Sequence, residues 1–194
     1  MSITTKRFIL GAGGALLFAL GSSFAAQAGG GYGGPYGFGA PVDEAELAKI
    51  NIDVMPDGRG APEGSGTYEE GMAVYADNCA ACHGEDMASP VKGTGAAALR
   101  GGRGSLDSGT PNKTVESYWP YASTVFDYVK RAMPFDAPGS LSDDEVYAVV
   151  AYILAEGEII DKDTPVSASN IGTIEMPNRN GFVPDPRPDV YNYE

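Results

Sequence analysis

The stretch Cys79-Ala80-Ala81-Cys82-His83 holds both cysteines and the only histidine of this 194-residue chain. At the end of a helix, thiols at positions i and i+3 lie on one face, where each can form a thioether to a vinyl group of one porphyrin. The histidine that follows directly can turn its imidazole beneath the iron as an axial ligand. This spacing predicts the covalent attachment of one haem c.

Three other interpretations of the motif have weaker support in the sequence. A Cys-x-x-Cys redox dithiol is typical of a thioredoxin-like βαβ pattern, which we do not find. A zinc site needs more ligands, and the chain has no further cysteine or histidine. A disulfide between residues three apart on a helix is strained. We therefore prefer the haem interpretation.

A single histidine leaves the sixth coordination position of the iron to be filled or left open. The methionines after residue 28 are Met55, Met72, Met87, Met133 and Met176. We expect Met72 to pack in the core, because it shares a helix with the motif, and Met87 is too close to the motif to reach the opposite haem face. Met133 precedes Pro134 in a loop, where the proline stiffens the backbone around a weak thioether ligand. We predict Met133 as the sixth ligand, with Met176 or simple apolar packing of Met133 as the alternatives.

The porphyrin propionates need hydrogen-bond donors, and the segment before Met133 supplies five candidates. These candidates are Arg100, Arg103, Tyr118, Trp119 and Tyr121. Core burial with a satisfied polar tip is an equally good interpretation of Trp119 and Tyr121. Ligation by histidine and methionine leaves no open site for a substrate, which favours electron transfer over catalysis. The alternative is a haem enzyme or gas sensor with a labile sixth ligand.

Capping residues and apolar spacing predict three helices. They run from Thr67 to the motif, over residues 123–132, and from Ser142 to about Gly157. Glu70 and Glu145 complete capping boxes at the first and third helices, and Pro134 helps to end the second. Residues 92–110 are glycine-rich without periodicity, and we find no convincing strand pattern. The sequence therefore predicts an all-α fold with a few short helices, long loops and a haem that fills a thin core.

Composition predicts the remaining organisation of the chain. Lys6 and Arg7 precede an apolar stretch, and Ala26-Gln27-Ala28 supplies the small-x-small pattern of a signal-peptide cleavage site, with an uncleaved membrane anchor as the alternative. Export places the protein in the periplasm with no membrane span after cleavage. The predicted segments are a signal peptide (1–28), a Gly-rich and acidic linker (29–50), a mono-haem domain (51–163) and an extended Pro-rich tail (164–194).

The chain carries a strong excess of negative charge. Its formal net charge is −13, and removal of residues 1–28 takes away two basic and no acidic residues, which leaves −15. Nucleic-acid binding needs clustered lysine and arginine, so we exclude it. An acidic surface suits docking to a basic patch on a protein partner, although the charge can also serve solubility alone.

The haem motif and several longer segments together resemble one group of proteins. These segments are 51–60 (NIDVMPDGRG), 62–67 (PEGSGT), 119–154 (WPYASTVFDYVKRAMPFDAPGSLSDDEVYAVVAYIL) and 176–182 (MPNRNGF). The chain is similar to class I c-type cytochromes, and more narrowly to the cytochrome subunits of periplasmic sulfite dehydrogenases. It also resembles the cytochrome subunit that partners a molybdenum sulfur dehydrogenase in sulfur oxidation. The resemblance extends from about Asn51 to Asp189.

The resemblance implies a cytochrome c fold with the iron ligated by His83 and Met133. It also implies that electrons arrive from a molybdopterin subunit that oxidises sulfite to sulfate, and leave to another cytochrome. Some sulfur-oxidising relatives carry two haem motifs, whereas this chain has one, which favours the single-haem type. We therefore expect a non-catalytic electron-transfer subunit or carrier; the cytochrome subunit of another periplasmic oxidoreductase is the alternative.

Overall fold

The structure is a computed structural model that describes residues 41–184. The chain divides into two compact units, residues 1–44 and 45–194. The predicted signal peptide, most of the Gly-rich linker and the last ten residues of the predicted tail lie outside the described residues. The short helix α1 (Glu44–Ile50) has no buried residue, and Lys49 forms an ion pair with Glu46 at 2.6 Å.

The second unit is helical. Its elements in chain order are β1 (Ser65–Gly66), α2 (Tyr68–Asn78), α3 (Ala80–His83), α4 (Ala122–Ala132), α5 (Asp143–Glu156), β2 (Val166–Ser167) and the 3-10 helix η1 (Ile171–Thr173). The three predicted helices are confirmed as α2, α4 and α5, each within about one residue of its expected ends. Residues 92–110 contain no helix or strand, as expected.

The local sequence explains where α2 and α5 begin. The Thr67 side chain accepts the Glu70 amide while the Glu70 carboxylate binds the Thr67 backbone, and Ser142 and Glu145 make the same pair of bonds. Each capping box satisfies amides that the first helical turn leaves without a partner. The capping boxes therefore fix the starts of the two helices that pack against each other.

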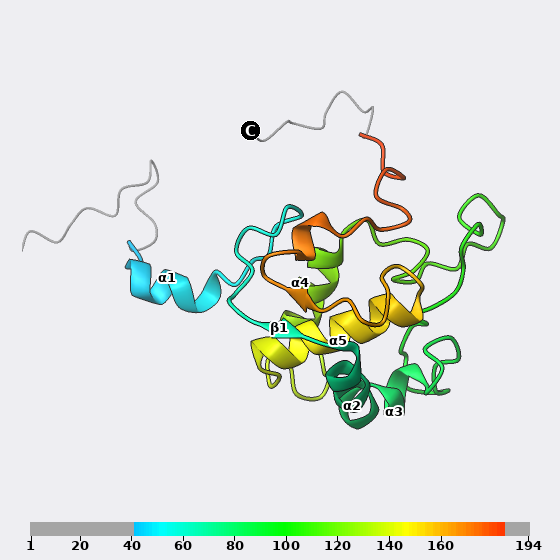
Figure 1. Cartoon of the computed structure of the whole chain (residues 1–194), viewed down its shortest axis with the longest axis horizontal. Helices are drawn as coiled ribbons and strands as arrows, with labels where there is room; N and C mark the ends of the chain where they lie inside the picture. Colours follow the sequence, from blue (N-terminus) through cyan, green and yellow to red (C-terminus); the bar gives the residue numbers. More distant parts are fainter. Residues whose placement is uncertain (1–40, 185–194) are drawn as a thin grey trace, which may run out of the picture. The chain divides into compact units, whose positions relative to one another are not determined.

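Helix α5 crosses the middle of the second unit and packs against both α2 and α4 (Figure 1). A Cβ atom at Gly71 of α2 would overlap the carbonyl oxygen of Ala148 of α5, so only glycine allows this close crossing. On the other side, Phe126 of α4 stacks on Tyr147 of α5 with ring centroids 4.4 Å apart, and both side chains are fully buried. Helix α5 therefore lies at the centre of the hydrophobic core, between α2 and α4.

The chain closes around these helices through a small antiparallel sheet. Gly66 of β1 pairs with Val166 of β2, so residues a hundred positions apart in the sequence meet. The segment after β2 also enters the core, where Val166, Ile171 and Met176 are at most 3% exposed. The first part of the predicted tail thus packs against the helices, and it contains the 3-10 helix η1.

Candidate haem site

The Cys-x-x-Cys-His motif lies at the junction of two helices. Cys79 caps the C-terminus of α2 and begins α3, and His83 is the last residue of α3. The amides of Cys82 and His83 both donate to the Cys79 carbonyl, at 3.1 and 2.9 Å. Gly84 follows with a φ of +80°, a conformation that favours glycine, and turns the chain sharply after the histidine.

The His83 imidazole is oriented by a backbone carbonyl. Its Nδ1 lies 2.8 Å from the carbonyl oxygen of Ala97. A ring N–H that donates to a carbonyl fixes the tautomer, so Nε2 keeps its lone pair for a metal. The carbonyl of Gly84, next to this histidine, accepts a 2.7 Å bond from the buried Tyr75 hydroxyl of α2. The imidazole is therefore held by helix, turn and loop.

The two thiols lie at the border of the core. Cys79 is half-buried and Cys82 is exposed, and the two form no disulfide with each other. Burial raises the pKa of the Cys79 thiol to about 11, with a smaller contribution from the neighbouring Cys82. A redox-active dithiol needs the opposite shift, a lowered thiol pKa. In residues 41–184, no three His, Cys, Asp or Glu side chains gather in a group that could hold a metal ion by themselves.

The five methionines differ in burial. Met87 and Met176 are 2% and 3% exposed inside the core, whereas Met55 and Met72 are 43% and 48% exposed. The expectation that Met72 packs in the core is wrong, because about half of its side chain is exposed. Met133 is different from all four: it is half-buried at the C-cap of α4 and packs against the core from its edge. Its thioether is thus neither enclosed by protein nor fully in solvent.

The candidate propionate donors fall into two groups. Arg100 binds Glu156 at 3.3 Å, and Arg103 binds Glu116 at 2.7 Å and donates to the carbonyl of Gly157. Both arginines therefore already have partners near the C-terminal end of α5, a pairing that the sequence analysis missed.

The three aromatic candidates lie before α4 instead. Tyr118 packs edge-on against Phe182, Trp119 packs edge-on against Tyr128, and the guanidinium of Arg179 lies over Tyr121. No hydrogen bond joins the Trp119 indole to another residue of the described range.

Comparison with known proteins identifies the family. Residues 66–153 match the family described as "Cytochrome C oxidase, cbb3-type, subunit III". A chain of the crystal structure of the sulfane dehydrogenase SoxCD from Paracoccus pantotrophus is 41% identical with a TM-score of 0.71, and the match covers 78% of this chain and 73% of that chain. The chain belongs to the class I c-type cytochromes. The expected all-α cytochrome c fold is confirmed.

Two curated relatives match shorter stretches of the cytochrome. Subunit CcoP of the cbb3-type cytochrome c oxidase of Cereibacter sphaeroides is 29% identical over 124 residues, which is 60% of this chain and 37% of the relative. The thiosulfate dehydrogenase of Stutzerimonas stutzeri is 30% identical over 93 residues, 47% of this chain and 28% of the relative. The chain thus spans about a third of the length of these curated relatives.

A c-type cytochrome domain implies haem c, and the residues around the motif fit this group. Several apolar side chains are half-buried and pack against the core, among them Cys79, Ala80, Leu99, Trp119 and Met133. These side chains keep apolar surface that protein does not cover, as expected for residues that line a porphyrin. With Nδ1 of His83 held by the Ala97 carbonyl, Nε2 of the same ring is available to bind a metal. The sequence could not reveal the roles of Leu99 and of the Ala97 carbonyl. A single leucine in a glycine-rich loop belongs to no motif, and a backbone carbonyl is present at every residue.

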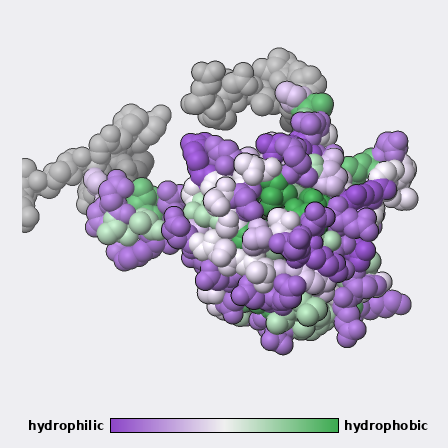
Figure 2. Space-filling view, viewed as in Figure 1, coloured by the Kyte–Doolittle hydropathy of each residue, from purple (hydrophilic) through white to green (hydrophobic). Residues whose placement is uncertain are grey.

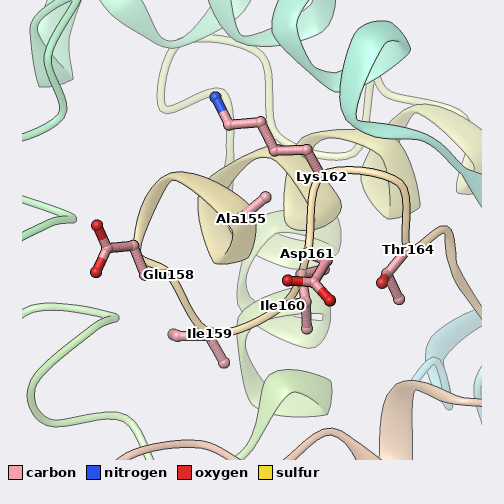
Figure 3. Close-up of a pocket in the computed structure, with 7 residues that line it drawn as sticks. All are labelled: Ala155, Glu158, Ile159, Ile160, Asp161, Lys162 and Thr164. Atoms are coloured by element: carbon pink, nitrogen blue, oxygen red, sulfur yellow. The ribbon is translucent and has the colours of Figure 1, made fainter.

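Two cavities lie away from the motif among the residues that the structure describes. One of about 490 Å³ is at the end of α5, where Ile159 and Ile160 line it and Lys162 extends away from the loop (Figure 3). The Lys162 ammonium is already bound by Glu156 and by the Tyr68 hydroxyl. The second, of about 380 Å³, lies between the Gly-rich loop at Leu106 and the segment at Asn178. Neither cavity is lined by a residue of the haem motif.

The surface carries the excess acidity that the composition predicts. Among the described residues, eight basic side chains form ion pairs with carboxylates, so little positive charge remains uncompensated. Polar and charged residues cover most of the face drawn in Figure 2, with apolar residues gathered in a patch among them. None of the described helices has the length and apolar character needed to cross a membrane.

Proposed function

We propose that this cytochrome is an exported mono-haem electron carrier, with one haem bound through thioethers to Cys79 and Cys82 and its iron ligated by His83 and Met133. The observation that carries the proposal is the 2.8 Å contact between Nδ1 of His83 and the Ala97 carbonyl, at the end of a Cys-x-x-Cys-His motif. The haem supplies one-electron redox chemistry when bound. The chain's part is to hold, orient and shield it.

Each residue of the site has a task that its position supports. The Ala97 carbonyl accepts the Nδ1 proton of His83, which keeps Nε2 available and raises the basicity of the ring. Met133, at the edge of the core, offers a thioether, and a histidine–methionine pair raises the reduction potential. Leu99 and Trp119 exclude water. Because Arg100 and Arg103 have carboxylate partners, Trp119 and the two tyrosines beside it are the better candidates for donors to the propionates.

The donor of electrons is, in this proposal, a molybdopterin dehydrogenase subunit that oxidises sulfite or a related sulfur compound, and the acceptor is another cytochrome. The support is the 41% identity, over most of both chains, to a chain of the sulfane dehydrogenase SoxCD. The match to thiosulfate dehydrogenase points to the same substrate class. Sulfur chemistry belongs to the partner, because the residues of this chain at the motif serve only to bind haem.

Two experiments test the proposal. Mass spectrometry of the periplasmic protein should find the mass of the chain without residues 1–28 plus one haem that denaturation and extraction do not remove; a chain without added haem would contradict it. Purification of the native complex should yield a molybdenum-containing subunit. A different oxidoreductase subunit in the complex would refute the assigned donor while leaving the carrier function in place.

The acidic surface predicts how the partner docks. If uncompensated carboxylates guide the encounter with a basic patch, the second-order rate of electron transfer should fall steeply as ionic strength rises. Stopped-flow reduction of the cytochrome by the purified partner at several salt concentrations measures this dependence. A rate that does not change with salt would leave solubility as the role of the acidity.

A further inference from the structure

The loop that follows Met133 forms hydrogen bonds within its own turns, and Leu141 at its end is buried in the core. It joins the C-cap of α4 to Ser142, the N-cap of α5. The amide of Ala137 donates to Pro134 at 2.9 Å and the amide of Ser140 donates to Ala137 at 3.2 Å. In the described part of the chain, no hydrogen bond or ion pair joins residues 134–141 to another segment. The position of the loop therefore depends on how its two ends are fixed.

One ion pair ties the two ends of this loop together. Lys130 Nζ of α4 lies 2.7 Å from Asp143 Oδ1 of α5, and the side chains are 23% and 37% exposed. Lys130 is in the last turn of its helix and Asp143 is the first residue of its own, so each charge is favourable at its helix terminus. Partial burial protects the pair from screening by salt. The pair therefore joins the two ends of the loop, and we call this Lys130–Asp143 ion pair the clasp.

The other charges near this point leave Lys130 without a substitute. The first turn of α5 also contains Asp144 and Glu145, which bind the Ser65 amide and the Ser142 backbone. In residues 41–184, no other basic side chain forms an ion pair with these three carboxylates. Loss of Lys130 would leave Asp143 among like charges, and the ends of the loop would no longer be drawn together.

We infer that the Lys130–Asp143 ion pair is a positioning device for Met133, which sets how readily the thioether leaves the iron. Lys130 is in the last turn of α4, three residues before Met133, which is the C-cap of the same helix. While the ion pair is intact, the loop holds the Met133 thioether near one position. When the ion pair is broken, the thioether dissociates from the iron more often. The inference rests on the proposed ligation by His83 and Met133.

The test compares ligand exchange in the ferric holoprotein of four variants. Imidazole is mixed with wild type, Lys130→Met, Asp143→Asn and the double variant, and the rate at which it replaces the thioether is followed by the absorption band of the methionine–iron bond near the red edge of the spectrum. We expect each single variant to exchange about threefold to tenfold faster, as for a partly buried ion pair. The double variant should be no faster than either single variant.

Controls separate this inference from a general loss of stability and from the ligation itself. Arg131→Gln removes the next charge on α4 and its ion pairs with Asp127 and Asp53, which do not span the loop. Its exchange rate should equal that of wild type; a rate as high as that of Lys130→Met, or no change in any variant, would overturn the clasp alone. If Met133→Ala kept the absorption band, the proposed ligation would fail, and the clasp with it.

Discussion

The loop that follows the Cys-x-x-Cys-His motif and the loop that follows Met133, the proposed second ligand, are held in different ways. On the histidine side, the Met87 carbonyl accepts hydrogen bonds from the amides of Leu99 and Arg100, and the Val91 amide donates to the Cys82 carbonyl. Backbone hydrogen bonds therefore connect this loop to the motif. On the methionine side, residues 134–141 form no hydrogen bond to another described segment, and only Leu141 at the end of the loop belongs to the hydrophobic core of the part of the chain that the structure describes. The comparison indicates a rigid imidazole and an adjustable thioether, so that ligand exchange should be concentrated at Met133.

The largest effect is expected at the rigid side. His83→Ala removes the iron ligand together with the bond to Ala97, and no other histidine can replace it. The purified protein should lack the low-spin spectrum of a six-coordinate haem altogether. Ala97→Gly keeps the backbone carbonyl and should keep the spectrum. A low-spin spectrum in His83→Ala would show that His83 is not a ligand of the iron.

The second effect should separate ligation from stability. Met133→Ala should lose the red-edge band, bind carbon monoxide rapidly in the ferrous state and lower the free energy of unfolding by about 1–2 kcal/mol, since the side chain is only half-buried. Met176→Ala should keep the band but lower the free energy of unfolding by more, about 2–5 kcal/mol, because Met176 is 3% exposed. An exchange of these two results would make Met176 the ligand.

The third prediction compares packing in the two loops. Met87 is 2% exposed, so Met87→Ala should lower the free energy of unfolding by about 2–4 kcal/mol. Phe135, next to Pro134 in the methionine loop, is 85% exposed, and Phe135→Ala should change it by less than about 0.5 kcal/mol. Denaturant unfolding of the holoproteins measures both. Equal losses of stability would contradict the difference in burial between Met87 and Phe135.

The smallest effect concerns acid. Hydrogen bonds from the Ser142 backbone and hydroxyl lower the pKa of Glu145 below its ordinary value of 4.5, and Thr67 lowers the pKa of Glu70 in the same way. A lowered pKa means that each cap contributes stability above about pH 4.5 and loses it as the pH falls through the folded-state value.

Because Glu145 caps α5 directly after the methionine loop, Glu145→Gln should weaken the red-edge band at a higher pH than in wild type. Glu70→Gln, on the histidine side, should change acid unfolding without a separate change in the band. Absorbance and circular dichroism, recorded over one pH titration, distinguish these outcomes. If the band weakened at the same pH in both variants, the methionine loop would not be more adjustable than the histidine side.

Local chemistry explains which parts of the molecule could be predicted from sequence. The capping boxes and the Cys-x-x-Cys-His motif are short-range patterns, and the structure bears out the helices that they start. The partners of Arg100 and Arg103 come from α5 and from Glu116, and the Gly66–Val166 pairing joins segments a hundred residues apart. Such contacts depend on how helices cross. Met72 shows the same limit, because its spacing on α2 does not reveal how much of the side chain its neighbours cover.

The pairing of β1 with β2 has a consequence for the chain between the two strands. Because Gly66 and Val166 meet across a hundred residues, the Cys-x-x-Cys-His motif and the helices α2, α4 and α5 all lie inside one long loop that this pairing closes. Closing so long a loop costs conformational entropy, and the packing of the helices on α5 must offset this cost.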